Sequence, residues 1–272
     1  NFYPYIASNT HWVYLKIMSI QINYKNSGLK NPSTNLVLFT DEKFNISHLK
    51  KYTSNTEFSY IKDLLKTSDL TKNIFVFEIN SKKKILLISI KKDLKRIDIE
   101  NLGAEFYRYI NYGKNSEYFI SSESIIGKHE NYTDYFLHGL KLKSYEFNKY
   151  KTKKEARLIS INVLGNKNKS SIQNKLKFKA LEEGIFYARD LVSEPGNILH
   201  PDEYAKRLNS LRKDGLKVNI YNEKKLKKLG MNALLGVGMG SIRGSYLVTM
   251  EWNGAKNNSK PLAFVGKGVT FD

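Results

Sequence analysis

The residues best suited to chemistry lie near the end of the sequence, where Lys267 stands between two glycines and Asp272 follows five positions later. A carboxylate is a hard oxygen ligand that can bridge two divalent cations. A lysine amine binds a metal only when it is neutral, and burial together with a nearby dication lowers its pKa. The pair therefore has two interpretations. One is a metal site. The other, which the spacing alone favours, is a loop lysine followed by an aspartate that caps a helix or lies in a turn.

The segment that must position this pair is a short apolar run, Leu262 to Val265, which predicts a buried strand. The run ends at Gly266, and glycines beside Lys267 would let the backbone and a metal approach closely. Open α/β sheets bind their ligands at the carboxyl ends of strands. We therefore expect Lys267 and Asp272 at the end of a core strand.

Other kinds of site are excluded or unsupported by the sequence. There are no cysteines, which excludes disulfides, thiolate zinc sites and cysteine nucleophiles. The glycine-rich stretch 236–240 lacks the dinucleotide fingerprint because Ser241 stands at the third glycine position, and Gly266-Lys267 lacks the other residues of a P-loop. The five histidines show no metal-ligand spacing, and no nucleophile-elbow motif occurs.

The formal net charge is +19, which is compatible with binding to nucleic acid or to an anionic membrane surface. The lysines are dispersed, however, in runs such as Lys82–Lys84 and Lys224-Lys225, and they are not grouped with aromatic residues. A general bias of the composition towards lysine explains the positive charge better than a binding surface does. No run approaches the about 18 apolar residues of a membrane span, and no signal-peptide pattern opens the chain. We expect a cytoplasmic protein without membrane contact.

Residues 1–165 predict one α/β domain with no catalytic constellation. Apolar runs alternate with segments of helical spacing, as in layered α/β folds. Asn80-Ser81 separates two runs as a hairpin turn. The expected strands are 13–22, 35–40, 74–79, 84–90, 118–121 and 158–164, and the expected helices are 98–112 and 131–144.

Residues 166–196 predict a linker. It consists of a polar stretch and a long helix that ends before Glu194-Pro195-Gly196. Residues 197–272 then predict a second, βαβ-like unit. Its expected elements are a helix opened by Pro201, a strand 216–221, a short helix 223–229, a glycine-rich connection 236–240 and a strand 245–252, followed by the final strand.

Three segments in this order and spacing resemble the leucyl aminopeptidase family of cytosolic metallopeptidases. They are Ala188 to Asn197, Leu229 to Ser241 and Val265 to Asp272. The resemblance implies a fold in which a macro-like α/β domain (1–165) and the linker helix precede the N-terminal part of an α/β metallopeptidase catalytic domain (197–272). Over the first 165 residues the match is limited to size and α/β character.

The resemblance implies an enzyme that releases N-terminal amino acids from peptides with water activated by two divalent metal ions, Zn or Mn. Lys267 would ligate one metal, and Asp272 would bridge both. Such enzymes usually assemble as hexamers of two stacked trimers, so the implied partners are peptide substrates and further copies of the chain.

The family pattern continues after the aspartate with Ser-Gly-Gly, a catalytic lysine and later acidic ligands, which the 272 residues do not contain. We therefore expect a truncated catalytic domain with no catalytic residues, inactive alone, whose missing strands leave apolar surface exposed. Two alternatives remain. One is a non-enzymatic basic protein that binds nucleic acid or a nucleotide, and the other is a structural α/β domain without a ligand.

Overall fold

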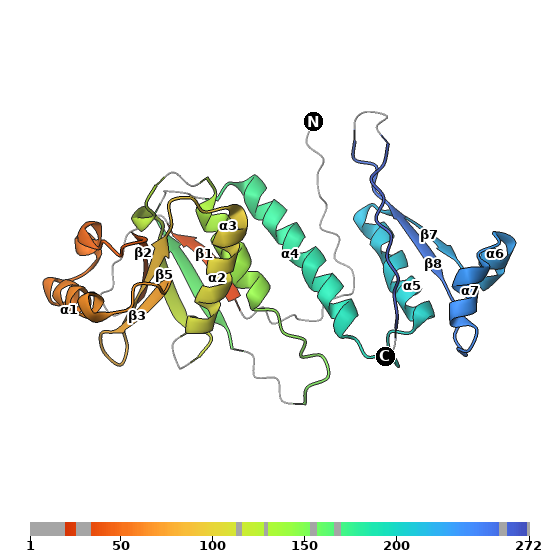
Figure 1. Cartoon of the computed structure of the whole chain (residues 1–272), viewed down its shortest axis with the longest axis horizontal. Coiled ribbons are helices and arrows are strands. Elements are labelled where there is room, and N and C mark those ends of the chain that lie inside the picture. The colour runs from red at the N-terminus through yellow and green to blue at the C-terminus, as the bar shows by residue number, and fades with distance from the viewer. Residues whose placement is uncertain are drawn as a thin grey trace. The chain divides into compact units, whose positions relative to one another are not determined.

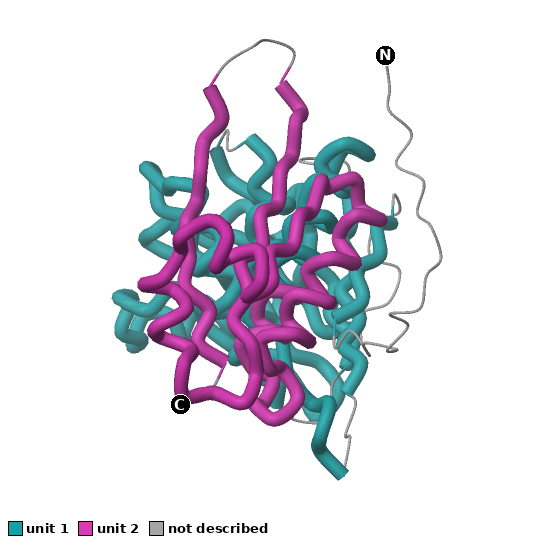
Figure 2. Tube along the Cα trace, turned by 90° about the vertical axis from the view of Figure 1, so that its right-hand side faces the viewer, with its two compact units in different colours: residues 1–186 teal, residues 187–272 magenta. Residues whose placement is uncertain are grey.

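The computed structural model of the chain describes residues 20–25, 34–112, 116–127, 130–152, 157–165, 170–255 and 260–270. The chain forms two compact units, 1–186 and 187–272, which Figure 2 shows in teal and magenta. The division falls inside the long helix α4, Ile172–Ser193. Among the described residues, no helix is both long and apolar enough to cross a membrane.

The first unit is built on a six-stranded sheet with the order β1-β6-β5-β2-β4-β3 in the described part of the chain. Neighbouring strands are parallel, except that β3 and β4 form an antiparallel hairpin. The central strands are continuous apolar runs because helices cover both faces of a parallel sheet. The strands are β1 (Ile20–Lys25), β2 (Asn35–Asp41), β3 (Ile74–Glu78), β4 (Lys84–Ile90), β5 (Glu117–Ser121) and β6 (Ile159–Leu164).

Helices pack on the two faces of this sheet, with α2 and α3 side by side in Figure 1. The first helix begins with a capping box, in which the Ser54 hydroxyl accepts a hydrogen bond from the Glu57 amide and the Glu57 carboxylate accepts one from the Ser54 amide. The helices are α1 (Asn55–Thr67), α2 (Arg96–Ile110), α3 (Tyr132–Lys143) and α4, and the 3₁₀ turns are η1 (Ser47–Tyr52) and η2 (Ser122–Ser124).

The core of the first unit has two layers, one on each face of the sheet. Alternate residues of β2 point to opposite faces, so Val37 and Phe39 pack with α2 and α3, whereas Leu36 and Leu38 pack with α1. All four side chains are at most 1% exposed. Burial on both faces explains why apolar and polar residues do not alternate along β2.

The second unit pairs β7 with β8 in an antiparallel ladder, and Val218 of β7 and Leu226 of α6 are buried. Pro201 occupies the first helical position of α5, where its missing N–H costs nothing. The elements are α5 (Pro201–Ser210), η3 (Leu211–Asp214), β7 (Lys217–Tyr221), α6 (Glu223–Lys228), α7 (Asn232–Gly238) and β8 (Leu247–Glu251).

The structure confirms the predicted α/β class and most predicted elements. The hairpin around Asn80-Ser81 is β3–β4, and the helices and strands predicted between residues 35 and 229 lie within a few residues of their expected positions. Of the first predicted strand, residues 13–19 lie outside the described residues.

Three predictions for the second unit are wrong. The glycine-rich connection 236–240 begins inside α7, because Ala233, Leu234 and Leu235 sustain a helix that two glycines do not end. The unit is not βαβ-like, because two helices return the chain so that β8 runs antiparallel to β7. Residues 262–265 form no strand, because the described residues provide no partner for them.

Candidate functional site

Lys267, the first predicted metal ligand, lies in the irregular segment 260–270 of the second unit. Its side chain is exposed, and the nearby apolar side chains of Phe264 and Val265 are 90% and 99% exposed. The segment passes close to α5, since a Cβ added at Gly268 would lie 3.1 Å from Cε1 of Tyr204. Glycine at this position therefore permits the approach of the chain to the Tyr204 ring.

Asp272, the second predicted ligand, lies outside the described residues. In the described part of the chain no three His, Cys, Asp or Glu side chains are grouped so that they could hold a metal ion. Because Asp272 lies outside the described residues, its pairing with Lys267 stays a prediction. No catalytic step through a metal therefore follows from the geometry of the described residues.

The first segment of the family motif ends at a turn that is fixed by an ion pair. Glu194 lies at this turn with its side chain buried, and Nη1 of Arg207 in α5 lies 3.4 Å from its carboxylate. Nε of Arg207 also donates to Glu203, 3.1 Å away. Glu194 thus holds the turn against α5, and its acidic group has a structural role in this unit.

The N-terminus of α5 is connected to the segment after α7. Arg243 contacts the Asp202 carboxylate at 3.2 Å, and the His200 imidazole hydrogen-bonds the other oxygen of the same carboxylate. Burial raises the pKa of Asp202, but hydrogen bonds from the backbone and His200, with the charge of Arg243, outweigh it and lower the pKa below its ordinary value. Asp202 is therefore a structural carboxylate that ties the two segments together.

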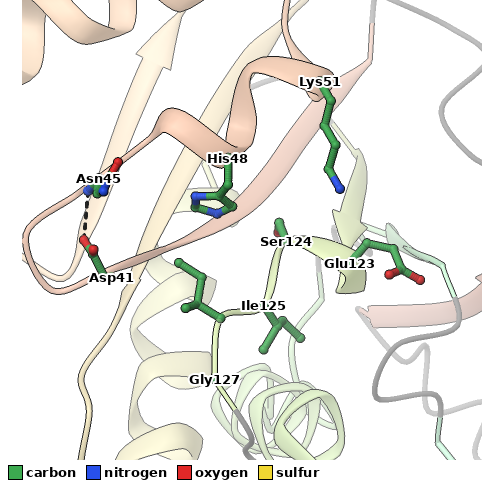
Figure 3. Close-up of a pocket in the computed structure, with 9 residues that line it drawn as sticks. Asp41, Asn45, His48, Lys51, Glu123, Ser124, Ile125 and Gly127 are labelled. Atoms are coloured by element: carbon green, nitrogen blue, oxygen red, sulfur yellow. Dashed lines mark hydrogen bonds between the residues drawn. The ribbon is translucent and has the colours of Figure 1, made fainter.

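A different candidate site lies in the first unit, at the carboxyl ends of β2 and β5 (Figure 3). These strands are parallel neighbours whose connections diverge, since β2 leads to β3 at one edge and β5 leads to β6 on the other side. Ligands of open α/β sheets bind at such switch points. The crevice there has a volume of about 450 Å³ and is lined by Asp41, Asn45, His48, Lys51 and residues 123–127.

Two side chains at this crevice are fixed by the backbone of Phe39. Nε2 of His48 lies 3.0 Å from the Phe39 carbonyl oxygen, and the Ser124 hydroxyl accepts a hydrogen bond from the Phe39 amide. Ser124 also donates to the carbonyl of Ser121, so its hydroxyl is used as donor and acceptor. This leaves no activated serine, and the crevice is suited to binding a small polar ligand rather than to nucleophilic catalysis.

Sequence reasoning did not find this crevice. Asp41 is the last residue of β2, and His48 and Lys51 follow it, whereas Glu123 follows β5, some 80 residues later. The signal is the strand order, because only the adjacency of β2 and β5 brings these residues together. Local hydrophobic patterns do not specify that adjacency.

Comparisons with known proteins find relatives of the second unit. Residues 186–272 match the family model described as the cytosol aminopeptidase family, catalytic domain. A probable cytosol aminopeptidase of Brucella suis biovar 1 is 46% identical over 140 residues, which cover 49% of this chain and 28% of that protein. One of Agrobacterium fabrum is 44% identical over 143 residues, covering 50% of this chain and 29% of that protein.

A solved structure shows the same fold over most of the chain. A mutant of tomato leucine aminopeptidase superposes with a TM-score of 0.66, covering 85% of this chain and 50% of that one, at 19% sequence identity. The described residues thus define an α/β protein that shares its fold with that structure. Residues 186–272 are similar to the catalytic domain of the cytosol aminopeptidase family, and the chain spans somewhat more than a quarter of the length of the curated relatives that it matches.

Proposed function

We propose that this chain is part of a metal-dependent aminopeptidase that releases N-terminal amino acids from peptides. The observation that carries the proposal is the match of residues 186–272 to the catalytic domain of the cytosol aminopeptidase family. In this proposal residues 1–165 form a macro-like domain, 166–196 a linker helix and 197–272 the N-terminal part of the catalytic domain.

The proposed site residues are Lys267 and Asp272, as ligands of two divalent metal ions, Zn or Mn. When bound, such ions lower the pKa of a water molecule and polarise the scissile carbonyl. Two side chains cannot complete two coordination spheres, so further ligands and the catalytic residues must come from outside the 272 residues. We propose a cytoplasmic location and a homo-hexamer as the assembly that acts on peptides.

A direct test begins with the purified 272-residue chain, incubated with Zn²⁺ or Mn²⁺ and leucine p-nitroanilide. We expect no hydrolysis. The second arm is a chimera in which this chain replaces the corresponding part of the Brucella suis relative. We expect the chimera to hydrolyse the substrate when metal is present. Either Lys267→Ala or Asp272→Asn should reduce its turnover by at least about a hundredfold.

Lys260→Ala is the matched control, because Lys260 is an exposed lysine of the same segment. Its turnover should equal that of the parent chimera. A folded chimera without activity would contradict the proposed function, and an active chimera that tolerates Lys267→Ala would contradict the assignment of that ligand.

The alternative, a basic protein that binds nucleic acid or a nucleotide, remains a prediction for the first unit. Its test is the salt dependence of affinity, because neutralisation of phosphates releases counterions. Affinity for a DNA duplex that does not change with salt would argue against it.

A further inference from the structure

A second hollow of the first unit lies on the other side of the β2–η1 turn, against α1, and has a volume of about 470 Å³. Its floor is apolar, and its rim is basic. The floor consists of Phe44, Ile46, Phe58 and Leu65, with Leu70 at the margin, and the rim carries Lys43, Lys50, Lys62 and Lys66. We call this hollow the lysine-rimmed groove.

The floor is held in place by the β2–η1 turn. Phe44 has a positive φ of 53°, a left-handed conformation that costs about 1–2 kcal/mol for a residue other than glycine. The turn persists because the Phe44 ring is 4% exposed and packs edge-on against Phe75 at 4.8 Å. Oδ1 of Asp41 also accepts hydrogen bonds from the backbone amides of Lys43 and Asn45. The groove is therefore formed before any ligand binds.

The rim concentrates positive charge without carboxylates. Lys62 and Lys66 stand one turn apart on α1, where like charges repel. No Asp or Glu lines the groove, and Lys66 forms an exposed ion pair with Asp63 at 2.9 Å. In the described part of the chain, Lys43, Lys50 and Lys62 form no ion pair. The groove thus carries a net positive charge over an apolar floor.

We propose that the lysine-rimmed groove binds a small amphipathic anion, a carboxylate or phosphate group attached to an apolar body. The anionic group would lie among the lysine ammonium groups, and the apolar body would cover Phe58, Leu65 and Leu70. Leu70 is 41% exposed and would be buried by such a ligand. The volume lies within the about 300–1,000 Å³ of small-molecule sites.

The experiment is a calorimetric titration of the full chain at low salt, with probes kept below their micelle-forming concentrations. Decanoate and decyl phosphate should bind, and their comparison distinguishes a carboxylate from a phosphate ligand. Acetate and inorganic phosphate lack the apolar body and should bind at least about tenfold more weakly. Decyltrimethylammonium has the apolar body with the opposite charge and should bind equally poorly.

Variants separate the groove from the general charge of the chain. Lys50→Glu with Lys62→Glu should weaken decanoate binding by at least about tenfold, because the ligand then meets two carboxylates. Lys82→Glu with Lys92→Glu makes the same charge change at exposed lysines outside the groove. This control should change affinity by less than about threefold, through long-range effects alone. Leu70→Gln should weaken binding while the charge stays unchanged.

Several results would overturn the proposal. These are equal losses in the two double variants, acetate binding as tightly as decanoate, or no probe binding more tightly than about millimolar. An acidic peptide that binds the groove where decanoate does not would replace the small molecule by a protein partner. Circular dichroism of each variant shows whether the fold is intact, and the lysines involved are exposed.

Discussion

The Nδ1 atom of His138 lies 3.3 Å from Oε1 of Glu182, in a contact where each side chain is about 5% exposed. Nζ of Lys141 donates to the other oxygen, Oε2, at 2.9 Å. His138 and Lys141 belong to α3 and Glu182 to α4, so the Glu182 carboxylate binds two side chains of the neighbouring helix. This contact fixes the first half of α4 to the remainder of its own unit.

Loss of this carboxylate should destabilise the first unit. Glu182→Ala leaves the buried His138 ring without its acceptor, and we expect a loss of about 1–3 kcal/mol. Hydrogen exchange of the amides of α3 and of α4 up to Phe186 reports this unit alone. Glu183→Ala is the control, because Glu183 is exposed and its ion pair with Lys179 is long, at 3.8 Å. It should change stability by less than about 0.5 kcal/mol, and equal effects of the two substitutions would contradict the role of Glu182.

A second prediction concerns the buried ion pair between Lys83 and Glu57, at 2.7 Å. Burial raises the pKa of Glu57, but hydrogen bonds from Lys83 and Ser54 and the charge of Lys83 outweigh it, so the pKa lies below the ordinary 4.5. A lowered folded pKa contributes stability that is present above the unfolded pKa and is lost as pH falls through the folded value. This contribution should therefore be complete above about pH 4.5 and disappear at lower pH.

Lys83→Met should return the Glu57 pKa towards its ordinary value and reduce stability at neutral pH by about 1–3 kcal/mol. NMR titration of the Glu57 carboxyl and urea unfolding at pH 7 and pH 3 measure both effects. Lys84→Met is the control, since Lys84 pairs with the exposed Glu78 at 2.6 Å. A surface pair contributes at most about 1 kcal/mol. A difference between parent and Lys83→Met that is as large at pH 3 as at pH 7 would contradict the argument.

A third prediction follows from the close crossing of α2 and α3. A Cβ added at Gly139 would lie 1.9 Å from the carbonyl oxygen of Glu100, and one added at Gly103 would lie 1.9 Å from that of Phe136. Gly139→Ala must push the helix backbones apart and should cost about 1–3 kcal/mol or more. Gly184→Ala in α4 meets nothing within 4 Å and should stabilise by up to about 1 kcal/mol. Thermal unfolding of both variants tests the opposite signs, and stabilisation by Gly139→Ala would show that the helices are not in contact here.

The sequence predicts most elements of the first unit because their signals are local, but α1 (Asn55–Thr67) was not predicted. The apolar run 35–40 and the turn at Asn80-Ser81 each specify their element within a few residues. Lys83 shows the limit of such patterns, since it stands in a run of three lysines yet is 6% exposed. Its burial depends on Glu57, which is distant in sequence.

The candidate sites were less predictable because they depend on residues that are distant in sequence. The metal ligands rest on motif resemblance, and one of them, Asp272, lies outside the described residues. The crevice at β2 and β5 depends on strand order, and the lysine-rimmed groove depends on the contact of the β2–η1 turn with α1. Strand order and packing are long-range properties, whereas hydrophobic periodicity reports only which face of each element is buried.

The fourth prediction concerns the apolar run that was expected to be a core strand. Phe264 is 90% exposed, whereas Leu226 of the same unit is fully buried. Phe264→Ser should therefore change the stability of the 272-residue chain by less than about 0.5 kcal/mol, and Leu226→Ala should cost about 2–5 kcal/mol. Trp252 fluorescence during urea unfolding measures both. Destabilisation by Phe264→Ser comparable to that of Leu226→Ala would show that the run is packed in solution, and Lys267 would then stand at the end of a buried strand after all.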